Sequence, residues 1–399
     1  MRRLLVVLIM SCLLVGCQSA VAYQPQSLLK NIRANTVNEV QLPSSFTDYQ
    51  VDFAFDVFKN VYSTDANTLV SPLSMQFAFS MLTNGAVNTT LSEMEQVITG
   101  NTAISEYNVL MYSLMKDVLG KELLSANSVW FRDGFEVSSD FLQTVKDHYV
   151  AEAFQEAFDH TTVDAMNAWV KENTKDMIDQ LVEKIDDSVM MYLVNALAFE
   201  ATWEKQYTTN DVNKVPFIDY LGNEQMVDMM FSKENKYIEL DDVVGFVKDY
   251  EGAAYSFVAL LPQGDITEFV QSLDSEKYVE IMSSVKEEKI SAGLPKFTFS
   301  QTVGLKDLFK SMGMQSAFDV NSANFSKIAE NLYISDALQK TYICVNETGT
   351  TAAAVTSIEM GLTSTMMDSV FLDRPFVYMI VNNTTNIPVF VGSVMSFEE

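Results

Sequence analysis

Residues that could perform acid–base or nucleophilic chemistry are few in this chain of 399 residues. It has 2 histidines, His148 and His160, and both stand in polar sequence, so we expect them at the surface. They are poor material for a zinc site or a Ser-His-Asp relay. Cys344 lies in the apolar run from Tyr342 to Val345, where we expect a buried, inert thiol.

Sequence motifs of catalysis are also missing, since the chain contains no G-x-S-x-G, Walker, C-x-x-C or H-E-x-x-H pattern. We therefore expect a protein that is not an enzyme and that needs no metal and no cofactor.

The charge of the chain limits its partners. It has 53 Asp and Glu against 26 Lys and Arg, a net charge of -27. Such a surface repels phosphate backbones, so we expect binding of neither nucleic acid nor heparin. The acidic charge could steer cationic targets to the protein or simply keep it soluble, and the sequence leaves both readings open.

The N-terminus has the pattern of an export signal, with Arg2 and Arg3 ahead of a short apolar run. The tetrapeptide that ends in Cys17 resembles a bacterial lipobox, which predicts a signal peptide at 1–16 and a lipid on Cys17. The alternative is ordinary cleavage after Ala22 and release as a secreted protein. No later run approaches the roughly 18 apolar residues of a membrane span. We therefore expect an exported cell-surface lipoprotein that contacts the membrane only through its anchor.

The rest of the chain divides into a polar spacer at 17–43 and one large domain at 44–399. Hydrophobic periodicity predicts helices and strands along the whole domain. The helices are expected at 51–62, after Pro72, at 106–119 and at 166–182. The strands are expected at 123–131, 190–199, 256–261, 290–299, 332–345, 376–381 and 388–394. Helices cluster early and strands come from distant segments, so the fold class is α+β rather than a doubly wound sheet.

The segment at about 348–373 fits neither pattern well, although a compact domain seldom contains so long a stretch without a structural element. Read with a period of two, it places Thr350, Ala352, Ala354 and Thr356 on one face. A loop that can become a buried middle strand needs such small side chains and no proline. An Ala-rich helical turn is the alternative.

Several short segments, taken in order, resemble motifs of the serpin family over the body from about residue 44 to 397. They are Asn67–Ser74 with Asn84-Gly85-Ala86, Ser125-Ala126-Asn127, Asn167-Ala168-Trp169-Val170 with Thr174, Val194–Phe199 with Trp203, Leu294-Pro295-Lys296-Phe297, Ala317-Phe318 and Arg374-Pro375-Phe376. The most specific is the run from Glu347 to Thr356, which resembles the hinge of an inhibitory serpin. Its matching residues are Glu347, Gly349, Thr350, Thr351, Ala352, Ala353, Ala354 and Thr356.

The resemblance implies a serpin fold with three β-sheets, eight or nine helices and an exposed reactive-centre loop. It also implies a monomeric inhibitor of extracellular serine proteases that acts as a suicide substrate. The protease forms an acyl-enzyme with the loop, and the cleaved loop then inserts into the central sheet. A non-inhibitory serpin acting as a binding or carrier protein is the alternative, but its usual sign, bulky or charged hinge residues, is missing.

Two further sets of residues follow from the resemblance. The hinge residue Glu347 is expected to pair with Lys296. The sheet-opening region is expected to hold Ser71, Ser74, Asn195 and Gln339 together. Many serpins have a histidine where this chain has Gln339, and glutamine cannot titrate near neutral pH.

The scissile bond is placed differently by two family spacings. Counting from the hinge puts it between Thr363 and Ser364, and counting back from Arg374 shifts it to Ser364-Thr365. We favour the first. A small uncharged residue, with Leu362 in the neighbouring subsite, predicts elastase-like targets, subtilisin-like ones second, and poor trypsin-like ones.

Overall fold

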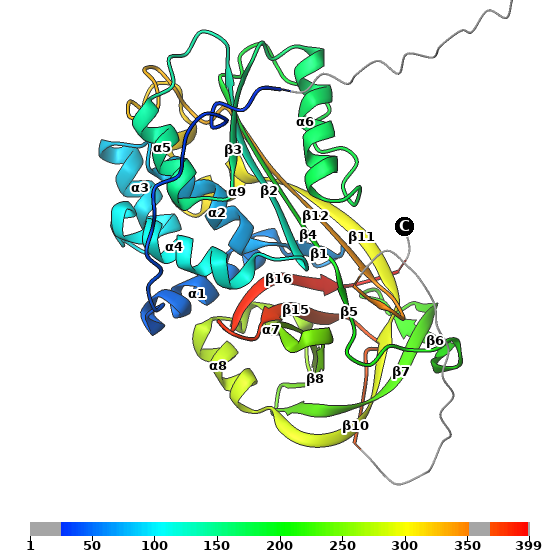
Figure 1. Cartoon of the computed structure of the whole chain (residues 1–399). Helices are drawn as coiled ribbons and strands as arrows, with labels where there is room; N and C mark the ends of the chain where they lie inside the picture. The colour runs from blue at the N-terminus through cyan, green and yellow to red at the C-terminus, as the bar shows by residue number, and fades with distance from the viewer. Residues whose placement is uncertain (1–24, 351–367, 398–399) are drawn as a thin grey trace, which may run out of the picture.

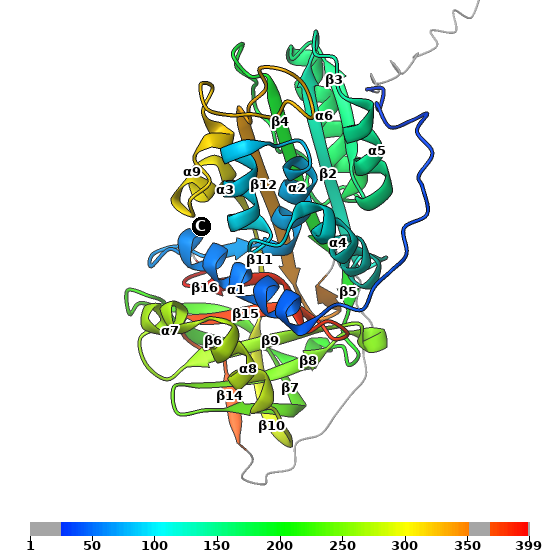
Figure 2. The same cartoon turned by 90° about the vertical axis from the view of Figure 1, so that its left-hand side faces the viewer.

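The computed structural model describes residues 25–350 and 368–397. Within them, helices gather against two sheets, one long and one strongly curved (Figures 1 and 2). The helices are α1 (Ser44–Val61), α2 (Pro72–Thr83), α3 (Asn88–Ile98), α4 (Ile104–Val118), α5 (Ser139–His148), α6 (His160–Asn173), α7 (Ile266–Ser272), α8 (Ser275–Ser283) and α9 (Leu305–Ser311). The α+β class expected from the sequence is confirmed.

The first sheet, here called the central sheet, contains the strands of the candidate site described below. Its order is β3 (Glu152–Glu156), β2 (Leu123–Arg132), β4 (Met191–Phe199), β12 (Asp336–Val345), β13 (Gly349–Thr350) and β5 (Ala201–Thr202), with β11 (Phe297–Gly304) also paired to β12. The helix α6 covers one face of this sheet, and α2 packs on the other (Figure 1).

The second sheet joins strands from the middle and the end of the chain. Its order is β1 (Thr68–Val70), β16 (Ile387–Val394), β15 (Phe376–Asn382), β9 (Tyr255–Pro262), β8 (Val243–Asp249), β7 (Glu224–Glu239), β10 (Lys286–Pro295) and β14 (Ser369–Phe371), with β6 (Val212–Ile218) beside β7. The long β7 pairs with β6 and β10 and, near its end, with β8. Because one strand serves both groups, the described strands form two hydrogen-bonded sheets where the family pattern counts three.

The central helix α2 shows how local sequence sets an element. Pro72 occupies the first helical turn, and the side chain of Ser71 accepts a hydrogen bond from the Ser74 backbone N–H. Every residue of α2 is buried. The helix therefore forms the core between the two sheets and brings Ser71 and Ser74 under the central sheet.

The predicted helix at 166–182 is wrong in both its limits. Asp159 caps the N-terminus of α6 through the N–H groups of Thr161 and Thr162, so the helix begins earlier. It ends at Asn173 because Lys175 and Asp176 take φ values of 48° and 64°, which no helix continues. The residues that follow form an irregular linker to β4.

Two predicted strands also differ from those observed. The run at 290–299 is two strands, β10 and β11, which separate at Lys296 and belong to different sheets. The run at 332–345 forms a strand only from Asp336, because Leu332 and Ile334 are buried in the core ahead of the strand. The hydrophobic pattern of the sequence did not show that the chain passes from one sheet to the other at Lys296.

The segment at 25–43, expected as a spacer, lies along the body (Figure 1). Ser27 forms a β-bridge with Phe154 of β3, and Leu29 is only 1% exposed. Further on, the Val40 N–H donates to Ser113 of α4 over 2.9 Å. Within the described residues, no helix is long and apolar enough to cross a membrane.

Candidate functional site

The candidate site is the line along which β4 and β12 meet in the central sheet, here called the seam. The two strands run parallel, paired from Tyr192 with Asp336 to Ala198 with Tyr342. They come from segments more than a hundred residues apart, and any strand that joined the sheet between them would have to separate them.

The middle of the seam is held by buried side-chain amides. The Nε2 of Gln339 donates to Asn195 Oδ1 over 2.6 Å, across the seam, and to the Ser71 carbonyl over 2.9 Å. Its Oε1 accepts from the Ser71 N–H at 3.1 Å. Asn195 in turn donates to the Ser74 hydroxyl over 2.5 Å and to Asn127. The structure thus brings together all four residues that the resemblance assigned to sheet opening, and adds Asn127.

This network is satisfied and carries no charge. Gln339 and Asn195 are both fully buried, and Gln339 uses both of its amide hydrogens and its oxygen. If these hydrogen bonds break, each buried polar group is left unpaired in an apolar environment unless an inserted strand supplies a new partner. None of its side chains titrates between pH 4 and pH 9, so the middle of the seam is insensitive to pH in that range.

At one end the seam is already occupied. The two-residue strand β13 pairs antiparallel with β12, where Thr350 faces Val345, and antiparallel with β5, where Gly349 faces Thr202. The strand β5 follows β4 after Glu200, so β13 sits between the extensions of the two seam strands. The first residues of the hinge therefore lie inside the central sheet, at the end we call the hinge end.

The residues of β13 fit this position closely. A Cβ on Gly349 would collide with the carbonyl oxygen of Ala201, so only glycine permits the close approach. Thr350 is 0% exposed, and its hydroxyl lies 2.7 Å from that of Tyr250. Burial raises the pKa of Tyr250 above its ordinary value, so the phenol stays protonated and able to share this bond.

The turn before β13 is held by two aromatic residues. The Trp203 N–H donates to the Thr348 carbonyl over 2.8 Å, and its indole Nε1 donates to the Asn346 carbonyl over 2.9 Å. The Tyr207 N–H donates to the Glu347 carbonyl over 2.9 Å. Three consecutive carbonyls, from the residue before the hinge to its second residue, are thus fixed by residues that follow β5.

The predicted pair of Glu347 and Lys296 is confirmed, with Nζ and Oε1 2.8 Å apart. Both side chains are partly exposed, at 16% for Glu347 and 33% for Lys296. Lys296 stands between β10 and β11, where the chain changes sheet. The pair ties the hinge to that crossover.

At the opposite end of the seam, here called the far end, β4 and β12 pair directly. Asp336 faces Tyr192 across it, and burial raises the pKa of the Asp336 carboxyl. The linker after α6 lines a hollow with Asp336 and Leu338 of this half. It also reaches past the middle of the seam, where Lys340 donates to the Gln180 carbonyl over 2.5 Å. Leu338 packs against the apolar cluster under α6, as does Tyr342 at the hinge end of the ladder.

Several predicted site residues lie outside the described residues. These are Cys17, the remaining hinge residues Thr351, Ala352, Ala353, Ala354 and Thr356, and the reactive-bond residues Leu362, Thr363 and Ser364. The expectation of a buried Cys344 was wrong, because β12 alternates and turns this side chain to its half-buried face. Among the described residues no group of His, Cys, Asp or Glu could hold a metal.

Sequence reasoning missed the residues that surround the hinge, namely Tyr207, Glu234, Lys248 and Tyr250. One signal was available for Lys248, since it directly follows the apolar run of β8. In the structure its side chain is only 2% exposed. A lysine in such a place needs a partner. Its partner, Glu234, is 14 residues away across the antiparallel pair of β7 and β8, and the register that brings the two side chains together could be found only from the fold.

Comparison with known proteins places this site in a family. The family model described as Serpin (serine protease inhibitor) matches residues 48–397. The chain is 29% identical to an uncharacterized serpin-like protein of Thermococcus kodakarensis, over 86% of this chain and 84% of that one. It is 28% identical to human neuroserpin, over 86% of this chain and 90% of neuroserpin.

Solved structures of one relative, in two conformational states, can be compared with this chain. The native form of the thermophilic serpin tengpin is 40% identical, with a TM-score of 0.90 over 94% of this chain and 100% of tengpin. The latent form gives a TM-score of 0.81 over 90% of this chain and 100% of that one. The structure is thus more similar to the native form. Since the family model covers nearly the whole body and the hinge enters the central sheet as the motifs implied, this chain belongs to the serpin family, whose members are in general inhibitors of serine proteases.

Proposed function

We propose that this protein inhibits extracellular serine proteases by suicide-substrate trapping, with the loop after β13 inserting between β4 and β12. The observation that carries the proposal is the position of β13, which is antiparallel to both of its neighbours at the hinge end of the seam. Residues that follow Thr350 and continue in the same direction would extend β13 along the seam.

The change of sheet order favours insertion. At present β4 and β12 form one parallel ladder. A middle strand would replace it with two antiparallel ladders, which pair slightly better per residue, and would double the number of backbone pairings. The small residues expected after Thr350 could enter the sheet beneath α6 without an unpaired charge.

Elastase-like proteases are the proposed targets, with subtilisin-like ones second. This rests on the small residue Thr363 before the proposed bond to Ser364, with Leu362 beside it. A pocket built around a buried carboxylate gains nothing from threonine, so trypsin-like proteases should react poorly.

The test is incubation with a panel of elastase-, subtilisin-, chymotrypsin- and trypsin-like proteases, followed by denaturing gel electrophoresis. A covalent complex that survives SDS, with a released peptide that begins at Ser364, is expected with the elastase-like enzymes. A peptide that begins at Thr365 would move the bond by one residue. Cleavage without any covalent complex across the panel would contradict the inhibitory function and favour a binding or carrier role.

For localisation we propose a lipid anchor on Cys17 at the cell surface. The support is the lipobox-like sequence, together with the contact of Ser27 with Phe154 of β3. Across β2, Phe154 is level with Tyr192 at the start of β4, so this contact lies at the far end of the sheet from β13. An anchor there would leave the hinge end facing away from the membrane. Cys17→Ser should move the protein from the membrane fraction to the medium; unchanged partition would indicate release after Ala22.

A further inference from the structure

One buried cation has no part in the insertion mechanism described above. The Nζ of Lys248 donates to Glu234 over 2.8 Å and to the Lys205 carbonyl over 3.1 Å. The side chains of Lys248 and Glu234 are only 2% and 10% exposed. Because desolvation of two charges costs much of what their attraction returns, such a pair is weak evidence for a stabilising role. Its position is more informative.

Lys248 lies against the two aromatic residues that hold the hinge. Its Nζ is 4.4 Å from the ring centroid of Tyr207 and 5.4 Å from that of Trp203, both within the range of cation–π attraction. Trp203 also stacks on Tyr250 at 4.4 Å, and Tyr250 meets Thr350. The cation thus sits behind the rings whose residues donate to the carbonyls of Asn346, Glu347 and Thr348.

We propose that Lys248 is a positioning residue for the hinge: held by Glu234, it fixes the rings of Trp203 and Tyr207 so that their N–H groups keep β13 in the central sheet. We call Trp203, Tyr207, Glu234 and Lys248 the Lys248 cluster. The cluster deepens the proposed function, since β13 is the first part of the loop to be inserted. Its significance for inhibition rests on that function, but its effect on the hinge can be measured without any protease.

The positive charge of Lys248 should be present at all physiological pH values. Burial favours the neutral amine, but Tyr207 and Glu234 outweigh it, so the pKa of Lys248 is raised above its ordinary 10.5. A raised lysine pKa means that the contribution of the charged form is complete at lower pH and is lost only as the pH rises through the folded value. The contribution of the Lys248 charge to hinge protection should therefore not decrease as the pH rises to 9.

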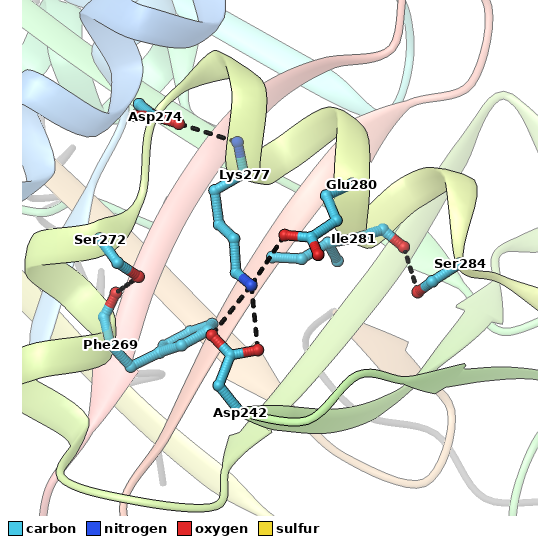
Figure 3. Close-up of polar contacts among 8 residues, drawn as sticks. All are labelled: Asp242, Phe269, Ser272, Asp274, Lys277, Glu280, Ile281 and Ser284. Carbon is cyan, nitrogen blue, oxygen red and sulfur yellow. Dashed lines mark hydrogen bonds and ion pairs between the residues drawn. The ribbon is translucent and has the colours of Figure 1, made fainter.

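The chain offers a matched control at the other end of β8. Lys277 of α8 binds Asp242, just before β8, and Glu280, each over 2.9 Å (Figure 3). Its side chain is 15% exposed. The variants Lys248→Met and Lys277→Met each remove one shielded lysine with two partners, but only the first lies against the hinge-holding rings.

The experiment is hydrogen–deuterium exchange of the intact protein, followed in peptides that cover residues 201–208 and 345–350. We expect Lys248→Met to speed exchange at the Trp203 and Tyr207 amides at least tenfold, because their hydrogen bonds to the hinge open more often. Lys277→Met should leave both amides at the wild-type rate, and Lys248→Arg, which keeps a cation over the rings, should stay within threefold of it.

The double variant Lys248→Met/Glu234→Met separates positioning from simple stability. It removes the unpaired carboxylate that the single variant would leave, so it should fold and unfold like the wild type. The proposal expects exchange at Trp203 and Tyr207 to remain fast in it. Wild-type protection in the double variant, or in Lys248→Met itself, would overturn the proposal.

A second measurement tests whether the Lys248 cluster affects inhibition. With a protease that the wild type traps, Lys248→Met should raise the number of inhibitor molecules consumed per protease at least threefold, because a hinge outside the sheet begins insertion later than one already inside. An unchanged ratio alongside fast exchange would overturn this link to trapping. If no protease is trapped by the wild type, the proposed function fails, and the exchange data still decide the role of Lys248.

Discussion

The two ends of the seam between β4 and β12 are built in opposite ways. At the hinge end a third strand, β13, already separates β5 from β12, and its residues are held by backbone hydrogen bonds. At the far end Asp336 and Tyr192 face each other directly, and both line a hollow with the linker after α6. The difference indicates a direction, because a loop that extends β13 meets the amide network of Gln339 before it reaches Asp336.

The comparison of the two ends also shows which part of the seam resists the separation of β4 and β12. The hinge end has made its strand pairings in the present structure, so little further cost remains there. The middle contains buried amides that must exchange partners, each interaction contributing about 1 kcal/mol. In the proposed mechanism the native state is kinetically trapped until the loop is cleaved, and it would then depend more on the middle of the seam than on its ends.

The largest effect is expected from a charge in β13. Thr350→Arg would bury an unpaired guanidinium or force the hinge out of the sheet, at a cost of several kcal/mol. The variant should fold but be cleaved as a substrate, with trapping reduced at least a hundredfold. Densitometry of the SDS-stable complex measures this. Thr298→Arg, at an exposed position of β11, is the control and should trap normally; equal trapping by both variants would mean that β13 is not the start of insertion.

Next in size is the middle of the seam. Gln339→Leu removes the bonds to Asn195 and Ser71 and leaves their buried groups unpaired, which should lower the free energy of unfolding by about 2–4 kcal/mol. It should also speed spontaneous conversion to a loop-inserted or polymeric form, followed by native gel electrophoresis at constant temperature. The variant for comparison is Gln301→Leu, on the neighbouring β11, and its conversion rate should be lower than that of Gln339→Leu. A conversion rate no higher in Gln339→Leu would show that the network does not limit opening.

The sequence predicted those parts of the site that depend on a local sequence pattern or a family motif. The segment at about 348–373 was singled out because small side chains share one face of a period-two pattern. The hinge within it and the pair of Glu347 with Lys296 came with the family resemblance, and the structure describes the hinge only as far as Thr350. The break at Lys296 and the end of α6 at Asn173 were missed, because a sheet crossover and two positive φ values leave little mark on hydrophobic periodicity.

The Lys248 cluster marks the other limit of sequence reasoning. Its members come from β7, β8 and the segment after β5, and no spacing along the chain relates Glu234 to Trp203. The half-buried position of Cys344 has the same origin, since an apolar run does not say which face of a central strand is covered. Long-range pairing, rather than local propensity, decided each of these features.

A smaller effect is expected at the hinge crossover. Glu347→Lys places two ammonium groups together where a partly exposed pair now contributes about 1 kcal/mol, so the hinge should leave its position more often. Polymers should form on mild heating roughly five times faster than in the wild type, as measured by size-exclusion chromatography. The control is Glu239→Lys, which reverses an exposed pair with Lys286. Equal rates for the two variants would contradict a role of the Glu347 pair in holding the hinge.

The smallest effect belongs to the far end of the seam and depends on pH. Burial raises the pKa of Asp336 from its ordinary 3.8, with Asp186 adding to the rise and Lys306 opposing it. A carboxyl whose pKa is raised in the folded state favours folding below the unfolded value and loses that contribution as the pH rises through the folded value. At neutral pH the ionised Asp336 therefore destabilises this end.

Asp336→Asn removes the charge and keeps an oxygen that can accept from the Ala337 N–H, now 2.9 Å away. The Tm at a fixed heating rate should rise by about 1 °C at pH 7 and be unchanged near pH 3, where both side chains are neutral. Asp164→Asn, at an exposed position of α6, should show no such difference between the two pH values. A gain of equal size at pH 3 would mean that packing, not charge, limits this end, and a loss at pH 7 would mean that the Asp336 carboxylate helps to hold the far end closed.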